Sequence, residues 1–244
     1  MLFRRISKHV KDQNWFAVVI DFAIVVLGVF IGLQVANWND KQSSKAELRV
    51  SLESLDKEVS QNMGVIEKVM THYEESSEDL TQGREALDAC DYSPEGQAAL
   101  ERSFYDFTQD VQPNFVTIAL DQLAGQGSYQ ELLSVQFKEN FGSYAGQLNE
   151  EYEQLTSHYE NMWRHHVNHH PYVTAYFPTN NTEIDGGWGF KLDKPFDEVC
   201  ADASFKNRFI NTIGFYISIN ERLGSLKTEV GTFQKSIAKE LERH

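Results

Sequence analysis

The chain has 244 residues, of which 41% are hydrophobic and 24% are charged, and its formal net charge at pH 7 is −14. Four of the basic and two of the acidic residues precede Trp38, which leaves the remainder with a net charge of about −16. This excess of acid argues against nucleic acid or anionic lipid as partners of that remainder, because both would be repelled. The length allows a short leader, one membrane span and a single further domain.

The first predicted element is a transmembrane helix over residues 15–38. No Lys or Arg occurs between Lys11 and Lys41, and Trp15 and Trp38 would lie roughly 34 Å apart in a helix. That separation matches a bilayer core with its interfaces, where tryptophan is favoured. An uncleaved signal anchor and a cleaved signal peptide are the alternatives. The long apolar stretch and the absence of a small-residue cleavage site favour the anchor.

Charge bias predicts the orientation of this span. The leader, residues 1–14, carries four basic residues, whereas the nearest cations after the span are Lys41 and Lys45. The positive-inside rule therefore predicts a cytoplasmic N-terminus and a periplasmic domain over residues 39–244, in a bacterial inner membrane. No later stretch is apolar and long enough to span, so we expect a single-pass protein.

One acid interrupts the span, and it lies on a face with two glycines. At about 100° per residue, Gly28 and Gly32 fall within roughly 20° of the direction of Asp21. A small-residue face lets two helices approach closely in lipid, and a polar side chain on it can bond across the contact. Asp21 thus has three interpretations: a contact in a homo-oligomer, a proton relay, or a shallow carboxyl that reaches headgroup water.

The span is predicted to continue as one long helix, because no proline occurs between Trp38 and Tyr92. Apolar residues recur every seven positions from Leu48, which indicates a narrow seam that serves either an intrachain bundle or a partner chain. One position of the repeat is Leu52, Val59, Ile66, Tyr73, Leu80 and Leu87, and the other is Leu48, Leu55, Asn62 and Val69.

Further helices are predicted over residues 94–108, 115–123, 129–168 and 201–241, separated by proline and glycine signals. Ser93 before Pro94 is typical of a helix N-cap and first-turn proline. Residues 172–195 are predicted to be irregular, with a short strand over residues 171–177. The fold class is therefore all-α: one N-terminal transmembrane helix that continues into an antiparallel helical bundle.

The two cysteines, Cys90 and Cys200, both follow the span. In an oxidising periplasm they would form one bridge that closes a loop of about 110 residues, and the alternative is two separate buried thiols. Neither has a neighbouring pattern that indicates an activated nucleophile.

Four histidines cluster at the end of a predicted helix. His165 with His169, and His166 with His170, have the i, i+4 spacing that can chelate a transition metal such as Zn²⁺. No third ligand is identifiable. A pH-sensitive cluster and ordinary, partly exposed histidines near a helix C-terminus are the alternatives.

The span segment resembles the start of a family of uncharacterised bacterial membrane proteins, described as a domain of unknown function. In that family an acid, an apolar stretch and a glycine-containing run end in a motif similar to ALQxNNWNE. Asp21 falls where the family has Glu, Gly28 falls on its glycine, and residues 33–40 match the closing motif except at Ala36. Residues 117–148 resemble its turn-centred segment. The resemblance implies a membrane-anchored helical protein and no activity.

These observations predict an oligomeric assembly or interaction component and not an enzyme, with no cofactor unless the histidines bind a transition metal. The short leader, early aspartate and periplasmic domain are also similar in layout to the small stator subunits of flagellar and Ton/Tol motors. The alternative is therefore a proton-coupled subunit that uses Asp21 and has a multi-span membrane partner. A metal-binding protein is the third hypothesis.

Overall fold

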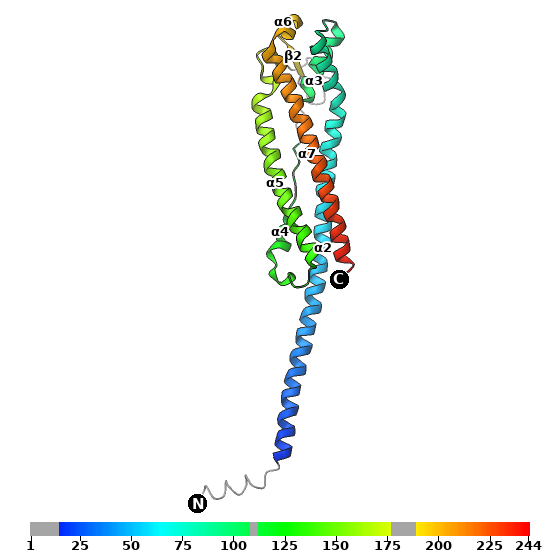
Figure 1. Cartoon of the computed structure of the whole chain (residues 1–244), viewed down its shortest axis with the longest axis vertical. Helices are drawn as coiled ribbons and strands as arrows, with labels where there is room; N and C mark the ends of the chain where they lie inside the picture. Colours follow the sequence, from blue (N-terminus) through cyan, green and yellow to red (C-terminus); the bar gives the residue numbers. More distant parts are fainter. Residues whose placement is uncertain (1–14, 108–111, 177–188) are drawn as a thin grey trace, which may run out of the picture.

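The computed structural model describes residues 15–107, 112–176 and 189–244, and it confirms the all-α fold class. Three long helices, α2, α5 and α7, run along a bundle whose remaining positions are filled by shorter elements (Figure 1). The first part of α2 extends alone from one end of this bundle. We call that end of the bundle the stalk end and the opposite one the far end.

Helix α2 (Trp15–Ala89) has 75 residues and no break, so it is about 110 Å long. From Val19 to Glu47 every side chain is exposed or partly exposed, and Leu48 is the first buried one. An 18-residue window in this helix has a mean hydropathy of 2.4 and no buried residue. By length and composition it can cross a membrane.

The seven-residue seam of α2 is confirmed as the side that faces the bundle. All ten seam residues are buried: Leu48, Leu52, Leu55, Val59, Asn62, Ile66, Val69, Tyr73, Leu80 and Leu87. Gly83 occupies the next position of the seam, where a Cβ would lie only 2.7 Å from Ser103 Oγ. Glycine therefore allows the close approach of α2 to the next helix.

Helix α3 (Pro94–Asp106) begins as predicted. Ser93 adopts extended backbone angles and its hydroxyl accepts the N–H of Gly96 at 3.1 Å, with Pro94 at the first helical position. A non-helical segment, residues 112–117, then leads to α4 (Ile118–Gly125) and the 3₁₀ turn η1 (Gly127–Tyr129).

Helix α5 (Val135–His165) is shorter at both ends than the predicted helix over residues 129–168. It begins after Ser134, whose hydroxyl accepts the N–H of Phe137 at 3.1 Å. It ends because His166 turns to extended backbone angles, φ −59° and ψ 138°, before the 3₁₀ turn η2 (Val167–His169).

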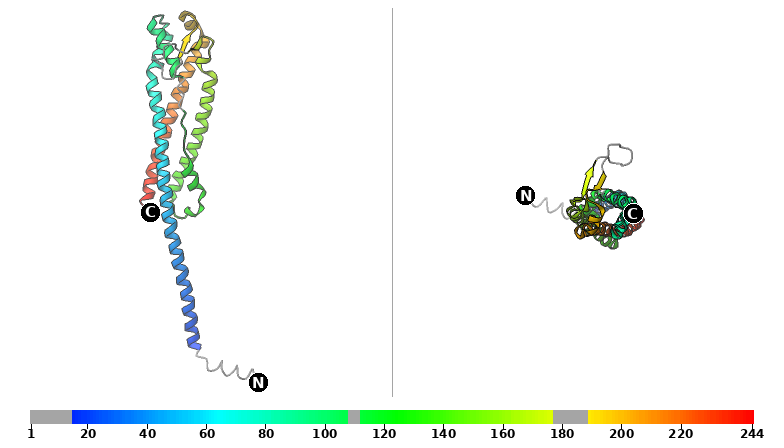
Figure 2. Two further views of the ribbon diagram at one scale, coloured as in Figure 1. Left: turned by 180° about the vertical axis from the view of Figure 1, so that it is seen from behind. Right: turned by 90° about the horizontal axis from the view of Figure 1, so that it is seen from above.

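The predicted irregular region contains a small sheet. Strands β1 (Val173–Tyr176) and β2 (Gly189–Leu192) pair antiparallel, and residues 177–188 lie outside the described part. A short helix, α6 (Phe196–Ala201), follows and was not predicted, because six residues are too few to show a period. Helix α7 (Ala203–Leu241) then returns along the whole bundle and ends near the point where α2 leaves it (Figures 1 and 2).

Packing makes α2 and α7 the centre of the molecule. Helix α2 contacts α3, α4 and α7, whereas α5 is held mainly by α7. The ring of Tyr144 on α5 stacks on Phe233 of α7 at 4.4 Å between centroids. Both side chains are buried, so this pair fixes α5 along the stalk-end half of the bundle.

A disulfide joins Cys90 to Cys200, with 5.6 Å between their Cα atoms. Cys90 follows the last residue of α2 and has a positive φ of 49°. There the N–H of Asp91 reaches the carbonyl of Ala86, so Cys90 occupies the left-handed position that ends a helix. The bridge ties this helix end to α6 and closes a loop with a sequence separation of 110 residues.

We expect loss of this bridge to lower the free energy of unfolding by up to about 4 to 5 kcal/mol, because the unfolded chain regains the freedom of a long loop. Urea unfolding of a Cys90→Ser, Cys200→Ser variant should therefore have an earlier midpoint than the oxidised protein. Reduced wild-type protein should match the variant. An oxidised protein no more stable than the variant would contradict a stabilising bridge.

Candidate functional site

The predicted contact face of the span is fully exposed. Asp21, Gly28 and Gly32 are all exposed and precede Leu48, the first buried residue of α2. A Cβ added at either glycine would meet nothing within 4 Å. In the described residues no hydrogen bond or ion pair involves Asp21. This chain therefore leaves the face free for another helix.

Beyond the exposed segment, polar contacts join α2 to the bundle. Asn62 is fully buried at a seam position. Its Nδ2 donates to the carbonyl of Val116 at 2.8 Å, and its Oδ1 accepts the N–H of Val116 at 2.9 Å. Segment 112–117 is not helical, so its backbone groups need outside partners, and Asn62 supplies both at one residue.

One helical turn earlier, Glu58 holds the start of α4. Its side chain is buried, and its two carboxylate oxygens accept the N–H groups of Ala119 at 2.6 Å and Leu120 at 3.0 Å. These are among the first N–H groups of α4, which have no partner within that helix. The positive end of the α4 dipole also favours a carboxylate there. Helix α2 thus positions both the non-helical segment and α4.

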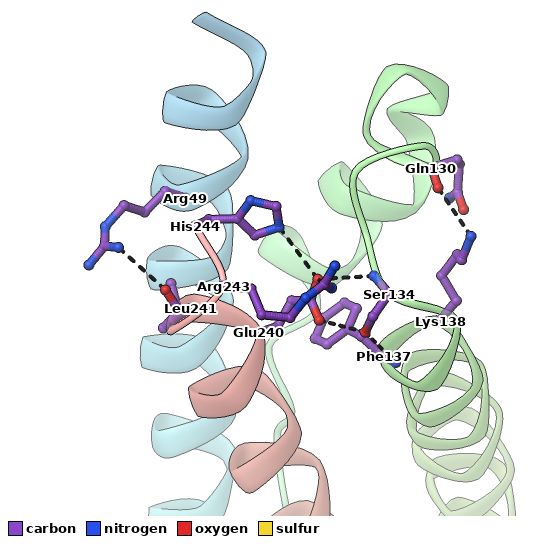
Figure 3. Close-up of polar contacts among 9 residues, drawn as sticks. All are labelled: Arg49, Gln130, Ser134, Phe137, Lys138, Glu240, Leu241, Arg243 and His244. Atoms are coloured by element: carbon purple, nitrogen blue, oxygen red, sulfur yellow. Dashed lines mark hydrogen bonds and ion pairs between the residues drawn. The ribbon is translucent and has the colours of Figure 1, made fainter. Parts of the chain in front are cut away.

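A third contact joins α5 to α7 at the stalk end of the bundle (Figure 3). Glu240 is 2% exposed, and its carboxylate accepts the N–H of Ser134 at 3.0 Å and the hydroxyl of Ser134 at 2.6 Å. Arg243 binds the same carboxylate, and His244 Nε2 lies 3.4 Å from it. Beside this cluster, Arg49 of α2 donates to the carbonyl of Leu241 at 3.4 Å.

Glu240 is ionised in this setting. Burial opposes its charge, but the hydrogen bonds from Ser134 and Arg243 outweigh burial and hold the pKa of Glu240 below its usual range. A buried carboxylate with several donors is a strong contact. It fixes the end of α7 against the start of α5, close to where α2 emerges.

We call Arg49, Glu58, Asn62, Ser134 and Glu240 the junction. Their contacts connect α2 to α4, α5 and α7 within the half of the bundle nearest the stalk. These contacts fix the position of α2 relative to the elements that it touches. The junction positions helices.

The histidines do not form the helical pairs that their spacing predicted, because α5 ends at His165. His165 and His169 are exposed, whereas His166 and His170 are buried. Within residues 15–107, 112–176 and 189–244, no group of three or more His, Cys, Asp or Glu side chains lies close enough to hold a metal ion.

The two buried histidines bind backbone instead. His166 Nδ1 accepts the N–H of Asn168, which leaves the proton on Nε2 to be donated to the carbonyl of Phe107 at 2.9 Å. Burial is the main cause that lowers the pKa of His166 to about 4. Burial also lowers the pKa of His170, whose Nδ1 accepts the N–H of Tyr172. His166 is therefore neutral and holds the end of α3.

Asp106, in the last turn of α3, has the opposite shift. Burial, and then repulsion by Asp79, raise its pKa to about 7, although Arg102 partly offsets them. Its Oδ2 is buried without a hydrogen bond in the described structure. Asp106 and His166 thus make opposite contributions to the pH dependence of stability.

The sequence pattern places Asn62 as a polar residue in an apolar seam, but it does not predict the hydrogen bonds of Asn62 to Val116. Glu58, Ser134 and Glu240 were missed. Ser134 carried a usable signal, since serine before an apolar-periodic run is typical of an N-cap. Glu58 and Glu240 carried none, because their partners are backbone groups far away in the sequence.

No protein-family model, curated protein or solved structure matches this chain. The resemblance to a family of uncharacterised membrane proteins therefore stays a prediction.

Asn62→Leu should lower the free energy of unfolding by about 2 to 4 kcal/mol, because it leaves two buried backbone groups of Val116 without partners. Leucine retains the apolar character of the seam, so the loss measures the missing hydrogen bonds and not a cavity. The exposed neighbour Gln61 provides the control, and Gln61→Leu should change stability by less than about 0.5 kcal/mol. Equal effects of the two variants in urea unfolding would refute the role of Asn62.

Acid should weaken the fold through His166. Its folded pKa of about 4 lies below the ordinary value of 6.5, so the stabilisation is complete above pH 6.5 and is lost as the pH falls towards 4, by up to about 3 kcal/mol. His166→Gln should remove much of this slope, whereas the exposed His165→Gln should retain it. The difference between the two variants, measured by denaturation from pH 7 to pH 4.5, cancels the opposite contribution of Asp106.

Proposed function

We propose that this chain is a single-pass membrane protein of the bacterial inner membrane that self-associates through its span and acts as an assembly or interaction component. Its leader would be cytoplasmic and its acidic bundle periplasmic, as the charge bias of the leader predicts. The observation that carries the proposal is the unbroken helix from Trp15 to Ala89.

Continuity gives the span a direct mechanical connection to the bundle. Residues 39–47 continue α2 as a polar, exposed or partly exposed helix between the apolar segment and Leu48. A helix resists twisting and bending, since each residue is tied to the next turn by a hydrogen bond. A rotation or tilt of the span would therefore reach Arg49, Glu58 and Asn62 without passing through a flexible linker.

The exposed face of the span supports self-association. An aspartate in hydrocarbon is costly unless it finds a partner, and glycines at i+7 and i+11 on the same face allow a second helix to approach. In the described structure the chain supplies no such partner to Asp21. A second copy that presents the same face would supply one, in the two-fold arrangement common among homodimers.

Cysteine cross-linking tests the proposal. The two native cysteines are joined to each other, so an introduced cysteine has no native thiol to compete with it. Asn39 lies 18 residues after Asp21, which is five full turns at 3.6 residues per turn, and it therefore shares the direction of Asp21. Lys41 points to nearly the opposite side. Both are exposed in the stalk. Copper-phenanthroline oxidation in membranes should cross-link Asn39→Cys into dimers and leave Lys41→Cys largely monomeric.

Gly28→Leu and Gly32→Leu, added together to the Asn39→Cys chain, should lower the dimer yield at least about three-fold, because the bulkier side chains hold the helices apart. Val29→Leu, outside the glycine face, should leave the yield unchanged. Equal dimer yields from Asn39→Cys and Lys41→Cys, or no dimer from either, would contradict self-association through this face.

Asp21→Asn separates a helix contact from a proton path. Asparagine keeps a hydrogen-bonding group, so the cross-link should persist, whereas Asp21→Leu should weaken it. Loss of a cellular phenotype in Asp21→Asn with an intact cross-link would instead favour the proton-coupled interpretation.

A further inference from the structure

A pocket of about 460 Å³ lies between α4 and α5, beside the junction. One wall is made by segment 112–117 and α4, and the opposite wall by residues 141–152 of α5. Its surface is mainly apolar, with Phe115 and Leu120 on one side and Phe141 and Leu148 on the other. This volume is within the range of pockets that hold small organic molecules.

The two walls share one contact, since Asn62 Nδ2 donates to the hydroxyl of Tyr144 on α5 at 3.5 Å, and each wall also has its own anchor. Asn62 and Glu58 fix the wall of segment 112–117 and α4 to α2 through Val116, Ala119 and Leu120. The opposite wall is fixed to α7, where Asn140 donates to Ser236 at 2.9 Å and Tyr144 stacks on Phe233. Each wall has its own anchor, so the pocket does not need an occupant to keep its shape.

The charge of the pocket lining is negative, and its other polar side chains, Thr117, Asn149 and Tyr152, are neutral. Asp121 is the only charged side chain among the described residues that line it. Thr117 Oγ1 donates to Asp121 Oδ2 at 3.1 Å, and no described contact involves Asp121 Oδ1. Tyr152, with 50% of its surface exposed, adds an aromatic side chain to the same lining.

We propose that this pocket binds an organic cation with an apolar body. The apolar walls favour burial of the body, the carboxylate of Asp121 pairs with the positive charge, and the electron-rich ring of Tyr152 attracts it as well. An anion of the same shape is disfavoured by Asp121 and by the net charge of about −16 of the chain after the span. The proposal does not depend on self-association of the span.

Tetraphenylphosphonium and tetraphenylborate are suitable probes, since they have nearly the same shape and opposite charges. Isothermal titration of the full chain in detergent, corrected with protein-free micelles, should show saturable binding of tetraphenylphosphonium with a Kd at or below about 1 mM. Tetraphenylborate should bind at least five-fold more weakly. Equal binding of the two probes, or no saturable binding of the cation, would overturn the proposal.

Two kinds of variant assign the binding to this pocket. Asp121→Asn should weaken tetraphenylphosphonium binding by about five- to thirty-fold, as expected for a partly exposed ion pair with an aromatic contribution. Asp88→Asn removes an exposed charge from α2 at the far end and should have no effect. An unchanged Kd in Asp121→Asn would refute the assignment.

Filling the pocket provides an independent test. Ala145→Trp on α5 and Ala124→Phe on α4 each place an aromatic ring in the lining and should abolish saturable binding, whereas Ala46→Leu in the stalk should not. Ala124 is exposed, so Ala124→Phe should fold even if the α5 variant does not. Retained binding in a folded Ala124→Phe protein, shown by circular dichroism, would place the probe elsewhere.

Discussion

Helix α2 is the constraint on which the rest of the structure depends, because one continuous helix carries both an exposed apolar segment and the buried seam of the bundle. The exposed segment is apolar on most of its surface, with Asp21 as its one acid, and the part after Leu48 narrows the apolar surface to the seam. Helices α3, α4 and α7 pack on that seam, and α5 is attached through α7. The position of α2 therefore sets those of α3, α4 and α7 directly and that of α5 through α7.

The junction solves a problem that a plain four-helix bundle would not have. Residues 112–117, which precede α4, run without helical hydrogen bonds beside α2, and their backbone must be satisfied from outside. Asn62 and Glu58, one turn apart on α2, meet this need with side chains of the right reach. The same two residues hold one wall of the α4/α5 pocket, so the position of α2 and the shape of the pocket are linked.

The sequence predicted what depends on periodicity. The apolar span, the ten seam positions, the capped start of α3 at Ser93 and the short strand after Pro171 all follow from local patterns, and the structure contains each of them. The prediction of one Cys90–Cys200 bridge, left open against two free thiols, is also confirmed.

The predicted end of α5 was wrong for a physical reason. Helix α5 ends at His165, because His166 and Asn168 bind the carbonyls of Phe107 and Phe104, which are far away in the sequence. No periodicity reports such long-range hydrogen bonds. For the same reason the sequence pattern does not distinguish the buried acids Glu58 and Glu240 from solvent-exposed ones. The pocket that Asp121 lines also cannot be inferred from the pattern.

The order of the elements along the chain has a consequence for folding. The seam of α2 is complete by residue 89, yet α7, which covers much of it, begins only at Ala203. Helices α3 and α4 follow α2 closely, but more than a hundred residues must be made after α2 before α7 can cover its part of the seam. In that interval the part of the α2 seam that α7 covers in the finished structure stays open. Cys200 and α7 both lie in the last fifth of the chain, so the bundle and its Cys90–Cys200 bridge can be completed only when most of the chain has been made.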